Sequence, residues 1–201
     1  MEGSERMGNP APEPPSDLDT RPLPLEVLPL GSAIHRVHVI ARGPKFFGRT
    51  GDWRFDSPDR SYGTLYGAKS ESACFVETLL RGLDGFVAQS ELKKRAFCRF
   101  TLTREVRLVR LYGPDMASIG ATAAVTSNPD YSLCQRWSRT LFLHRDAPDG
   151  IIYRSNYDND EHAIVLFDRA ANAIDGGSST PIMNDPSLLG SILNRYKASI
   201  R

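Results

Sequence analysis

Cysteine is scarce in this sequence. The chain has three cysteines, Cys74, Cys98 and Cys134, which lie far apart and are each set among apolar residues. An odd number without a Cys-x-x-Cys pair argues against a zinc site or a redox motif. The four histidines also lack metal-ligand spacing. We therefore expect buried, reduced thiols and no metal site.

An excess of charge of one sign is missing as well, since 25 Lys and Arg stand against 24 Asp and Glu. The whole chain thus lacks the electrostatic footprint of a protein that binds nucleic acid or an anionic membrane. A loose basic run lies at Arg99, Arg104, Arg107 and Arg110. Glu105 interrupts this run and no aromatic platform accompanies it, so we interpret it as the solvated face of two strands.

Long apolar runs are also absent: none approaches the roughly 20 residues of a membrane span. The N-terminus has no basic segment followed by an apolar core, which argues against a secretory signal. These observations predict a cytoplasmic protein without a membrane partner.

The first 30 residues are rich in Pro, Ser, Gly and acidic residues. Proline denies such a segment a helix or a central strand. We predict a flexible tail over residues 1–30, which could dock at its end through Leu23, Leu25, Val27 and Leu28. Residues 31–201 are expected to form a single domain that includes a C-terminal helix and is long enough to bury a sizeable core.

Hydrophobic periodicity predicts an interleaved order of strands and helices in this domain. The predicted strands are 34–39, 62–66, 96–103, 106–111, 151–154 and 163–167. The predicted helices are 71–80 with Ser70 as N-cap, 115–120, 130–143, and one that begins at Asp185-Pro186. Residues 41–60 and 170–184 are predicted as loops. Because strict βαβ alternation is missing, we predict an α+β domain with a mixed or antiparallel central sheet and flanking helices.

Glu77 is the most informative side chain of the sequence. On the predicted helix it shares one face with Ala73, Val76 and Leu80. A carboxylate in an apolar stripe costs several kcal/mol unless it is paired or neutralised. Two interpretations stay open: Glu77 reaches the edge of the stripe and pairs with an arginine, or it faces a cleft where its charge is used.

Two arginines also have two interpretations each. Arg36 lies in a predicted strand, and Arg54 lies in a loop between Trp53 and Phe55. Each is either a surface or ion-pairing arginine or a ligand for a diphosphate, because the planar guanidinium fork matches phosphate oxygens.

The pattern around Tyr62 and Tyr66 is typical of half-buried strand tyrosines, and Ser155 follows a strand, where serine commonly forms a turn. No Ser-His-Asp spacing, phosphate-binding Gly loop or GxGxxG motif is present. Local pattern alone therefore predicts an α+β domain with one unusual Glu and several Arg.

The order and spacing of several segments resemble the RES-domain family, which is named for an Arg, a Glu and a Ser. The segments are 34–37 (IHRV), 53–55 (WRF), 63–68 (GTLYGA), 74–79 (CFVETL) and 149–155 (DGIIYRS), with 131–137 (YSLCQRW) similar to the helix before the serine strand. The resemblance covers about residues 33–168. Val37 departs from the pattern, since many members have Tyr at this position.

This resemblance implies a fold similar to that of ADP-ribosyltransferases and NAD as the substrate. It implies that the nicotinamide–ribose bond is cleaved by hydrolysis or phosphorolysis, with no cofactor beyond NAD and with inorganic phosphate as a conditional co-substrate. The implied catalytic residues are Glu77, Arg36 and Ser155, and the implied substrate-binding residues are Arg54, Tyr66 and Tyr62. A protein ADP-ribosyltransferase with the same site, or a non-catalytic interaction module, remain as alternatives.

The resemblance also implies a partner. Many members are bacterial toxins encoded with an antitoxin that carries an Xre-like helix-turn-helix domain, and such an antitoxin would neutralise an enzyme that consumes NAD. Leu189, Ile192 and Leu193 of the last predicted helix either pack on the domain or serve a homodimer. Direct binding of nucleic acid is not expected.

Overall fold

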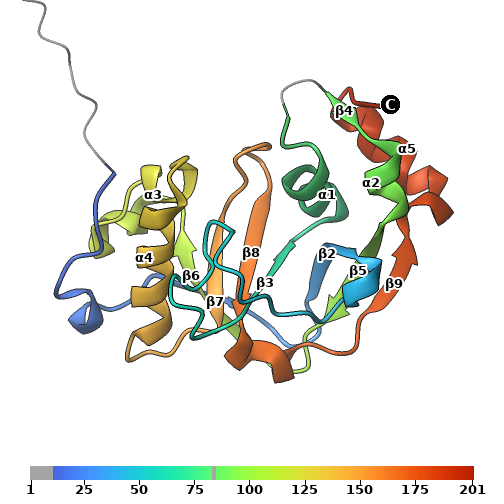
Figure 1. Ribbon diagram of the computed structural model, residues 1–201. Helices are drawn as coiled ribbons and strands as arrows, with labels where there is room; N and C mark the ends of the chain where they lie inside the picture. The colour runs from blue at the N-terminus through green and yellow to red at the C-terminus, as the bar shows by residue number, and fades with distance from the viewer. Residues whose placement is uncertain (1–10, 83–84) are drawn as a thin grey trace, which may run out of the picture.

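The computed structural model describes residues 11–82 and 85–201, which form a mixed eight-stranded sheet with helices around it (Figure 1). Its strands are β1 (Leu25–Leu28), β2 (Ala33–Val39), β3 (Thr64–Ala68), β5 (Arg95–Thr101), β6 (Val106–Leu111), β7 (Gly150–Arg154), β8 (His162–Phe167) and β9 (Ser178–Pro181). They lie in the order β1-β6-β7-β8-β3-β2-β5-β9. In this sheet β6 and β7 pair in parallel and the other neighbours pair antiparallel. The predicted α+β class is therefore confirmed.

The helices are α1 (Glu71–Leu79), α2 (Gln89–Lys93), α3 (Ala124–Ser127), α4 (Tyr131–Leu143) and α5 (Pro186–Arg195). Three of the helices, α1, α4 and α5, begin at capping side chains. Ser70 Oγ accepts a hydrogen bond from the Ala73 N–H, Asp130 caps α4 and Asp185 caps α5. Each of these contacts satisfies a backbone donor that the first turn of a helix leaves free. Short 3-10 turns lie at 18–20, 40–42, 114–119, 168–173 and 182–184.

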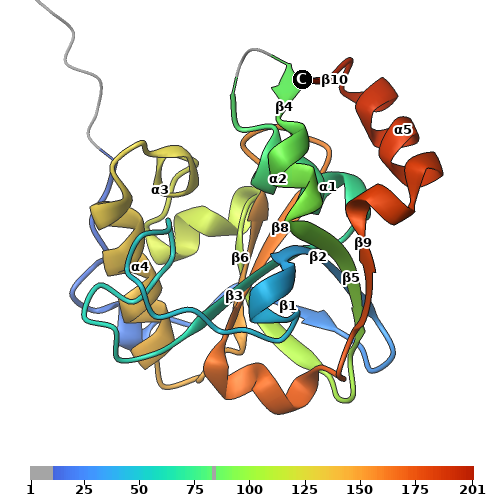
Figure 2. The same ribbon diagram turned by 45° about the vertical axis from the view of Figure 1, so that its right-hand side comes forward.

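The helices cover the sheet in two groups (Figure 1). At one end α4 packs on β6, β7 and β8, where Trp137 and Leu141 are fully buried. At the other end α1, α2 and α5 share a core cluster with β2 and β5. Leu189 and Ile192 of α5 are buried in that cluster, so their apolar surface is used within the chain. Figure 2 shows β9 at one edge of the sheet, from which the chain continues into α5.

The sheet is weakly joined between β2 and β3. A single pair of residues, His35 and Ala68, is in register there, whereas β3 pairs with β8 along its full length. Gly67 lies at this junction, where a Cβ atom would come within 2.8 Å of the His35 carbonyl oxygen. Glycine permits this close approach of two backbones. The junction separates two halves of the sheet, and α1 follows β3 directly and packs beside it.

The N-terminal segment differs from its prediction. Residues 11–30 are not a free tail, because β1 pairs with β6, Leu18 is fully buried, and the Trp137 indole donates to the Pro12 carbonyl at 2.8 Å. The flexible-tail prediction is therefore wrong for residues 11–30, whereas the predicted docking near residue 30 agrees with the structure for Leu23, Leu25 and Leu28 and not for the exposed Val27. Pro24 and Pro29 flank β1 and no proline lies within it, so proline does not interrupt its ladder with β6. Residues 1–10 lie outside the described part of the chain.

Two other predictions shift at their boundaries. The strand predicted from residue 62 begins at Thr64, and the predicted loop 170–184 contains the edge strand β9. A small parallel pair, β4 (Phe86–Val87) with β10 (Ser199–Ile200), was not predicted. In the described ranges, no helix combines the length and apolar character that a membrane crossing requires.

Candidate active site

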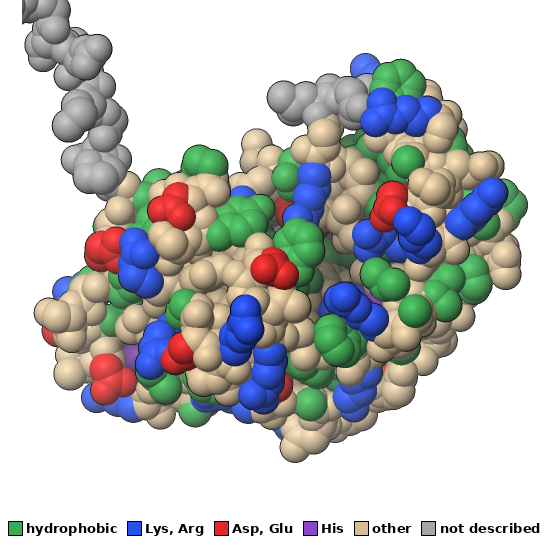
Figure 3. Space-filling view, viewed as in Figure 1, with side chains coloured by type: hydrophobic (Ala, Val, Ile, Leu, Met, Phe, Trp, Pro, Cys, Tyr) green, Lys and Arg blue, Asp and Glu red, His purple; other side chains and the backbone are tan. Residues whose placement is uncertain are grey.

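A cavity of about 440 Å³ opens where the two halves of the sheet meet. This volume falls within the roughly 300–1,000 Å³ typical of small-molecule sites. Its walls come from β2, β3, α1, the start of α4 and the loop at 41–60. Figure 3 shows basic and hydrophobic side chains around a depression on this face of the molecule.

The charge of the lining is strongly one-sided. Its arginines are Arg36, Arg42, Arg54, Arg81 and Arg95. Against them stands one lining carboxylate, that of Glu77. Low-dielectric walls of one charge sign concentrate ions of the opposite sign, so the cavity suits an anionic ligand.

Arg36, on β2, is half-buried, with its Nε fully buried. Its Nη1 donates to the Tyr66 carbonyl at 3.0 Å and its Nη2 to the Phe46 carbonyl at 3.4 Å, while its buried Nε has no hydrogen-bond partner. Burial lowers the pKa of Arg36 to about 10, which leaves the guanidinium protonated at neutral pH. No carboxylate of residues 11–82 or 85–201 pairs with it. A buried charge without a counter-ion is costly, and an anionic ligand would relieve that cost.

Arg54 is held at the opposite wall by α4 and the turn before it. Its Nη1 donates to the Asn128 carbonyl at 2.5 Å, and its guanidinium carbon lies 4.7 Å from the centroid of the Tyr131 ring. Stacking on an aromatic face and a backbone acceptor fix this arginine in one orientation. The remaining N–H groups of Arg54 can serve a ligand.

Glu77, on α1, reaches the cavity and forms no ion pair within the described residues. Its Oε1 accepts a hydrogen bond from the backbone N–H of Asn156 at 3.1 Å. Arg81, one turn later, donates to the backbone carbonyl of Glu77 and not to the carboxylate. The structure thus agrees with the interpretation in which Glu77 faces a cleft, and not with the structural ion pair.

Tyr66 lines the cavity, and its hydroxyl is engaged by the segment at 55–56. The hydroxyl donates to Asp56 Oδ1 at 3.1 Å and accepts from the Phe55 N–H at 2.9 Å. Burial, followed by the nearby charge of Asp56, raises the pKa of Tyr66 well above its ordinary value, so the phenol stays neutral. Asp56 is buried and also accepts from the Thr64 hydroxyl at 2.6 Å and the Trp53 N–H at 3.3 Å. This carboxylate therefore joins the loop that carries Trp53 to β3.

Ser155 lies next to the cavity but does not line it. Its buried Oγ accepts from the backbone N–H groups of Tyr157 at 3.1 Å and Asp158 at 3.2 Å. This is the turn-forming arrangement, and the following residue, Asn156, makes the contact with Glu77. The geometry assigns Ser155 to shaping the loop that reaches Glu77.

Tyr62 lies in the core, away from the cavity. Its hydroxyl is 2.8 Å from Ser138 Oγ, and its ring stacks on Phe142 with centroids 4.0 Å apart. Burial raises the pKa of its phenol. This corrects the prediction that Tyr62 binds substrate: it precedes β3, and its side chain fills the space between α4 and the sheet instead of facing the cavity.

Several lining residues were not singled out from the sequence. Trp53 is 48% exposed at the mouth, with the Arg81 guanidinium carbon 5.0 Å from its ring centroid. The guanidinium carbon of Arg42 likewise lies 5.4 Å from the centroid of the Phe46 ring. Arg81 could have been found from its helical spacing of four residues after Glu77, but the loop residues carry no periodic signal. The remaining lining residues not predicted include Arg95, Tyr131, Tyr153 and Tyr157.

The donor set does not suggest a metal. Across the residues whose placement is described, no group of three or more His, Cys, Asp or Glu side chains is arranged to hold a metal ion. Cys74, Cys98 and Cys134 are buried free thiols, as expected. Burial raises the pKa of each of them.

Comparison with known proteins relates this chain to a protein family. The model of the RES domain matches residues 33–183. A curated relative, "Probable toxin y4kH" of Sinorhizobium fredii (strain NBRC 101917 / NGR234), is 29% identical over 111 residues, which are 55% of this chain and 87% of that protein. A chain of the crystal structure of the M. tuberculosis MbcT–MbcA toxin–antitoxin complex superposes with a TM-score of 0.61 at 16% identity, covering 84% of this chain and 92% of the other. That likeness shows a shared fold. Since the family model spans most of the sequence, the chain belongs to the RES domain family.

Proposed function

We propose that this protein is the toxin of a toxin–antitoxin pair and that it acts by breaking the nicotinamide–ribose bond of NAD. The observation that carries the proposal is the cavity itself: among the described residues, one carboxylate, Glu77, faces a lining of five arginines, of which Arg36 has a buried Nε and pairs with no carboxylate. A dinucleotide presents a diphosphate to such arginines and two flat rings to the aromatic walls. The relationship to a protein named as a probable toxin, and the fold shared with a toxin–antitoxin complex, support the biological role.

The chemistry of NAD requires little acid catalysis. The nicotinamide nitrogen is cationic in the substrate, so the electron pair of the broken C1′–N bond neutralises it and nicotinamide leaves without a proton. Glycosidases with poor leaving groups use two carboxylates, one of them as a general acid. Here a single carboxylate suffices, in agreement with Glu77 as the one carboxylate among the described residues that line the cavity.

Glu77 would stabilise the positive charge that develops on the ribose as the bond breaks. A fixed negative charge in a site that excludes water is worth far more than in bulk solvent. The same carboxylate can accept a hydrogen bond from the 2′-hydroxyl or from the incoming water. When water attacks C1′, its proton is released and the products are ADP-ribose and nicotinamide.

The other lining residues would bind and orient the substrate. Arg36 and Arg54 would hold the diphosphate or, in a phosphorolytic reaction, the attacking phosphate. The rings of Tyr66 and Trp53 would pack against the planar groups of the nucleotide. Ser155 would act indirectly, through the loop that contacts Glu77.

A cognate antitoxin follows from this activity, because an enzyme that empties the NAD pool of the cytoplasm harms its own cell unless it is blocked. We propose an antitoxin with an Xre-like domain that places a segment over the cavity. Ile40, Phe46, Trp53 and Tyr157 are exposed apolar residues near its mouth that such a segment could cover.

The test is nicotinamide release from NAD by the purified protein, followed by chromatography with and without inorganic phosphate. Release without phosphate, together with ADP-ribose, is the expected result for a glycohydrolase, and release only with phosphate identifies a phosphorylase. Glu77→Gln serves as the matched inactive variant. If no nicotinamide is released under either condition, the NAD-degrading proposal fails. Incubation with labelled NAD and lysate then tests the alternative, protein ADP-ribosylation.

A further inference from the structure

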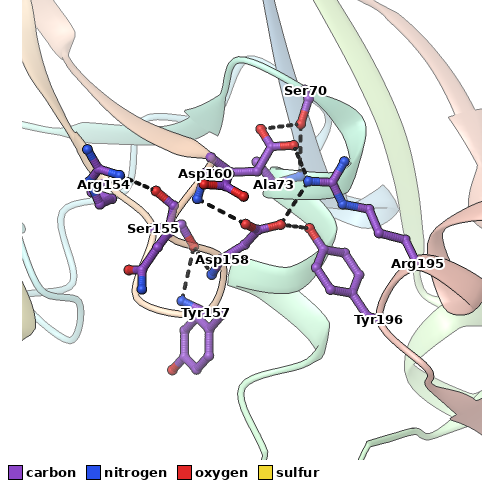
Figure 4. Close-up of polar contacts among 11 residues, drawn as sticks. Ser70, Ala73, Arg154, Ser155, Tyr157, Asp158, Asp160, Arg195 and Tyr196 are labelled. Atoms are coloured by element: carbon purple, nitrogen blue, oxygen red, sulfur yellow. Dashed lines mark hydrogen bonds and ion pairs between the residues drawn. The ribbon is translucent and has the colours of Figure 1, made fainter.

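The fold extends beyond the residues that the family model matches. The match ends at residue 183, whereas α5 runs from Pro186 to Arg195. The apolar face of α5 packs on the α1 cluster through Leu189 and Ile192. At its end, Arg195 and Tyr196 point toward the loop between β7 and β8, as Figure 4 shows.

These two side chains bind the carboxylates of that loop, residues 155–161. Arg195 Nη2 lies 2.9 Å from Asp158 Oδ2 and 3.0 Å from Glu161 Oε1. The Tyr196 hydroxyl donates to Asp158 Oδ2 at 2.9 Å. Both carboxylate side chains are only 14% exposed, so they share one cation in a partly desolvated setting. Without that cation, two like charges would face each other across the loop, which is unfavourable.

The loop in turn is tied to the helix that carries Glu77. Ser70 Oγ, the N-cap of α1, donates to Glu161 Oε2 at 2.9 Å. The Ser155 N–H donates to the Glu161 carbonyl at 2.9 Å, which closes the base of the loop. Arg195 therefore neutralises a carboxylate that already connects the loop to the first turn of α1.

The loop also makes the hydrogen bond to Glu77 described above. Ser155 Oγ accepts hydrogen bonds from the N–H groups of Tyr157 and Asp158. Asn156 lies inside this turn, and its own N–H donates to Glu77 Oε1. Asn156 is anchored on its other side by its side-chain amide, which donates to the Thr126 carbonyl at 3.0 Å. The orientation of the Glu77 carboxylate thus depends on how this loop is held.

We propose that Arg195 and Tyr196 are positioning residues of the active site, which keep the 155–161 loop closed so that Asn156 fixes Glu77 in its catalytic orientation. The inference rests on the proposed function of Glu77. It makes the site dependent on a C-terminal segment outside the matched domain. Neither Arg195 nor Tyr196 lines the cavity, so they act through the loop and not on the substrate.

The test uses the full chain with Arg195→Ala and a matched control, Arg104→Ala. Arg104 pairs with Asp149 at 2.7 Å and lies at the opposite end of β7, and the exposures of that pair, 41% and 10%, resemble the 47% and 14% of Arg195 and Asp158. Amide hydrogen exchange of the 155–161 loop measures directly how firmly the loop is held. Steady-state nicotinamide release, resolved into kcat and KM, measures the effect of the loop on catalysis.

We expect Arg195→Ala to speed exchange in the loop and to lower kcat roughly ten- to hundredfold with little change in KM, because a displaced catalytic group loses rate more than binding. Arg195→Lys should recover part of the loss, and Tyr196→Phe should show a smaller effect of the same kind. Arg104→Ala should lower stability while leaving loop exchange and kcat unchanged.

Three outcomes separate this inference from the proposed function. Unchanged loop exchange in Arg195→Ala overturns the inference, whatever the activity. Faster exchange with an unchanged kcat in an active enzyme also overturns it, because the loop would then not govern Glu77. If the wild-type protein releases no nicotinamide, the proposed function fails, and exchange alone still decides whether Arg195 holds the loop.

Discussion

The backbone N–H of Asn156 donates to Oε1 of Glu77 at 3.1 Å and joins two residues that lie 79 positions apart in the sequence. Among the residues with described positions, none donates a hydrogen bond to the second carboxylate oxygen, Oε2. Glu77 is thus held by one oxygen and has the other available for a ligand in the cavity. This half-anchored arrangement suits a carboxylate that stabilises charge on a substrate.

Replacing the charge of Glu77 should abolish most of the activity. Gln has the same shape as Glu and keeps an oxygen for the Asn156 N–H, so Glu77→Gln should preserve the fold. We expect nicotinamide release to fall roughly 10²–10³-fold, the loss typical of one electrostatic catalytic group. Turnover and the melting temperature are measured on the same preparation. A turnover equal to that of the wild type would remove Glu77 from the mechanism.

Arg54→Ala should weaken substrate binding. Its guanidinium lies at the wall between Asn128 and Tyr131, and its loss removes one ligand for the diphosphate. We expect the KM for NAD to rise about tenfold or more, as for a charge-assisted hydrogen bond. Because the internal hydrogen bond to Asn128 is lost too, the melting temperature should fall slightly. An unaltered KM would show that Arg54 only supports the wall.

Two tyrosines provide a matched pair of variants. Tyr62→Phe removes a buried hydrogen bond to Ser138 and should cost about 1 kcal/mol of stability without changing KM. Tyr66→Phe leaves the Phe55 N–H without its acceptor and removes the hydrogen bond that Asp56 accepts from Tyr66. The variant should lose roughly 1–3 kcal/mol of folding stability and also have a higher KM. Chemical denaturation and steady-state kinetics measure the two effects. A KM effect of Tyr62→Phe would return that residue to the substrate site.

The stability that the Asp158–Arg195 ion pair contributes should decrease at acidic pH. Burial raises the pKa of Asp158, but hydrogen bonds from Arg195, Tyr196 and the Asp160 N–H lower it, and the net pKa lies below the ordinary value of 3.8. A group whose pKa is lowered by folding stabilises the fold above its unfolded pKa, and this contribution is lost as the pH falls through the folded pKa.

The stability difference between wild type and Arg195→Ala should therefore be constant near neutral pH and shrink below about pH 4. Urea denaturation at a series of pH values measures it, with Arg104→Ala as the reference ion pair. A difference that grows on acidification would mean that Arg195 is not held by an ionised Asp158.

Local sequence patterns predicted most of the elements for physical reasons that act over a few residues. Ser70, Asp130 and Asp185 cap their own helices, and apolar alternation identified the strands at 106–111 and 163–167. The patterns failed where long-range contact decides the structure. The segment at 25–28 became a strand because β6 offered it an edge, and the flanking Pro24 and Pro29 gave no sign of that pairing.

The candidate site divides in the same way. The resemblance to the RES domain pointed to Arg36, Arg54, Tyr66 and Glu77, which the structure brings to one cavity. The resemblance also pointed to two residues that do not line the cavity. Tyr62 is in the core, and Ser155 shapes a loop. The resemblance did not include Arg95, and it gave Trp53 no site role although Trp53 falls in the matched segment 53–55, since a lining residue from a loop or an adjacent strand has no periodic signal in the local sequence.

The sequence by itself determined the α+β class, the starts of α1, α4 and α5, the buried thiols and an unusual carboxylate on an apolar helix face, because these follow from periodicity, capping and composition. Only the tertiary structure decided that Glu77 faces a cavity and pairs with no arginine of the described residues, because the segments around its carboxylate are distant in the sequence. It also decided that Arg36 pairs with no carboxylate of residues 11–82 or 85–201 and that Arg195 reaches the loop beside Glu77. Those facts depend on the close approach of β2 and β3 at Gly67 and on the packing of α5, which bring together residues far apart in the chain.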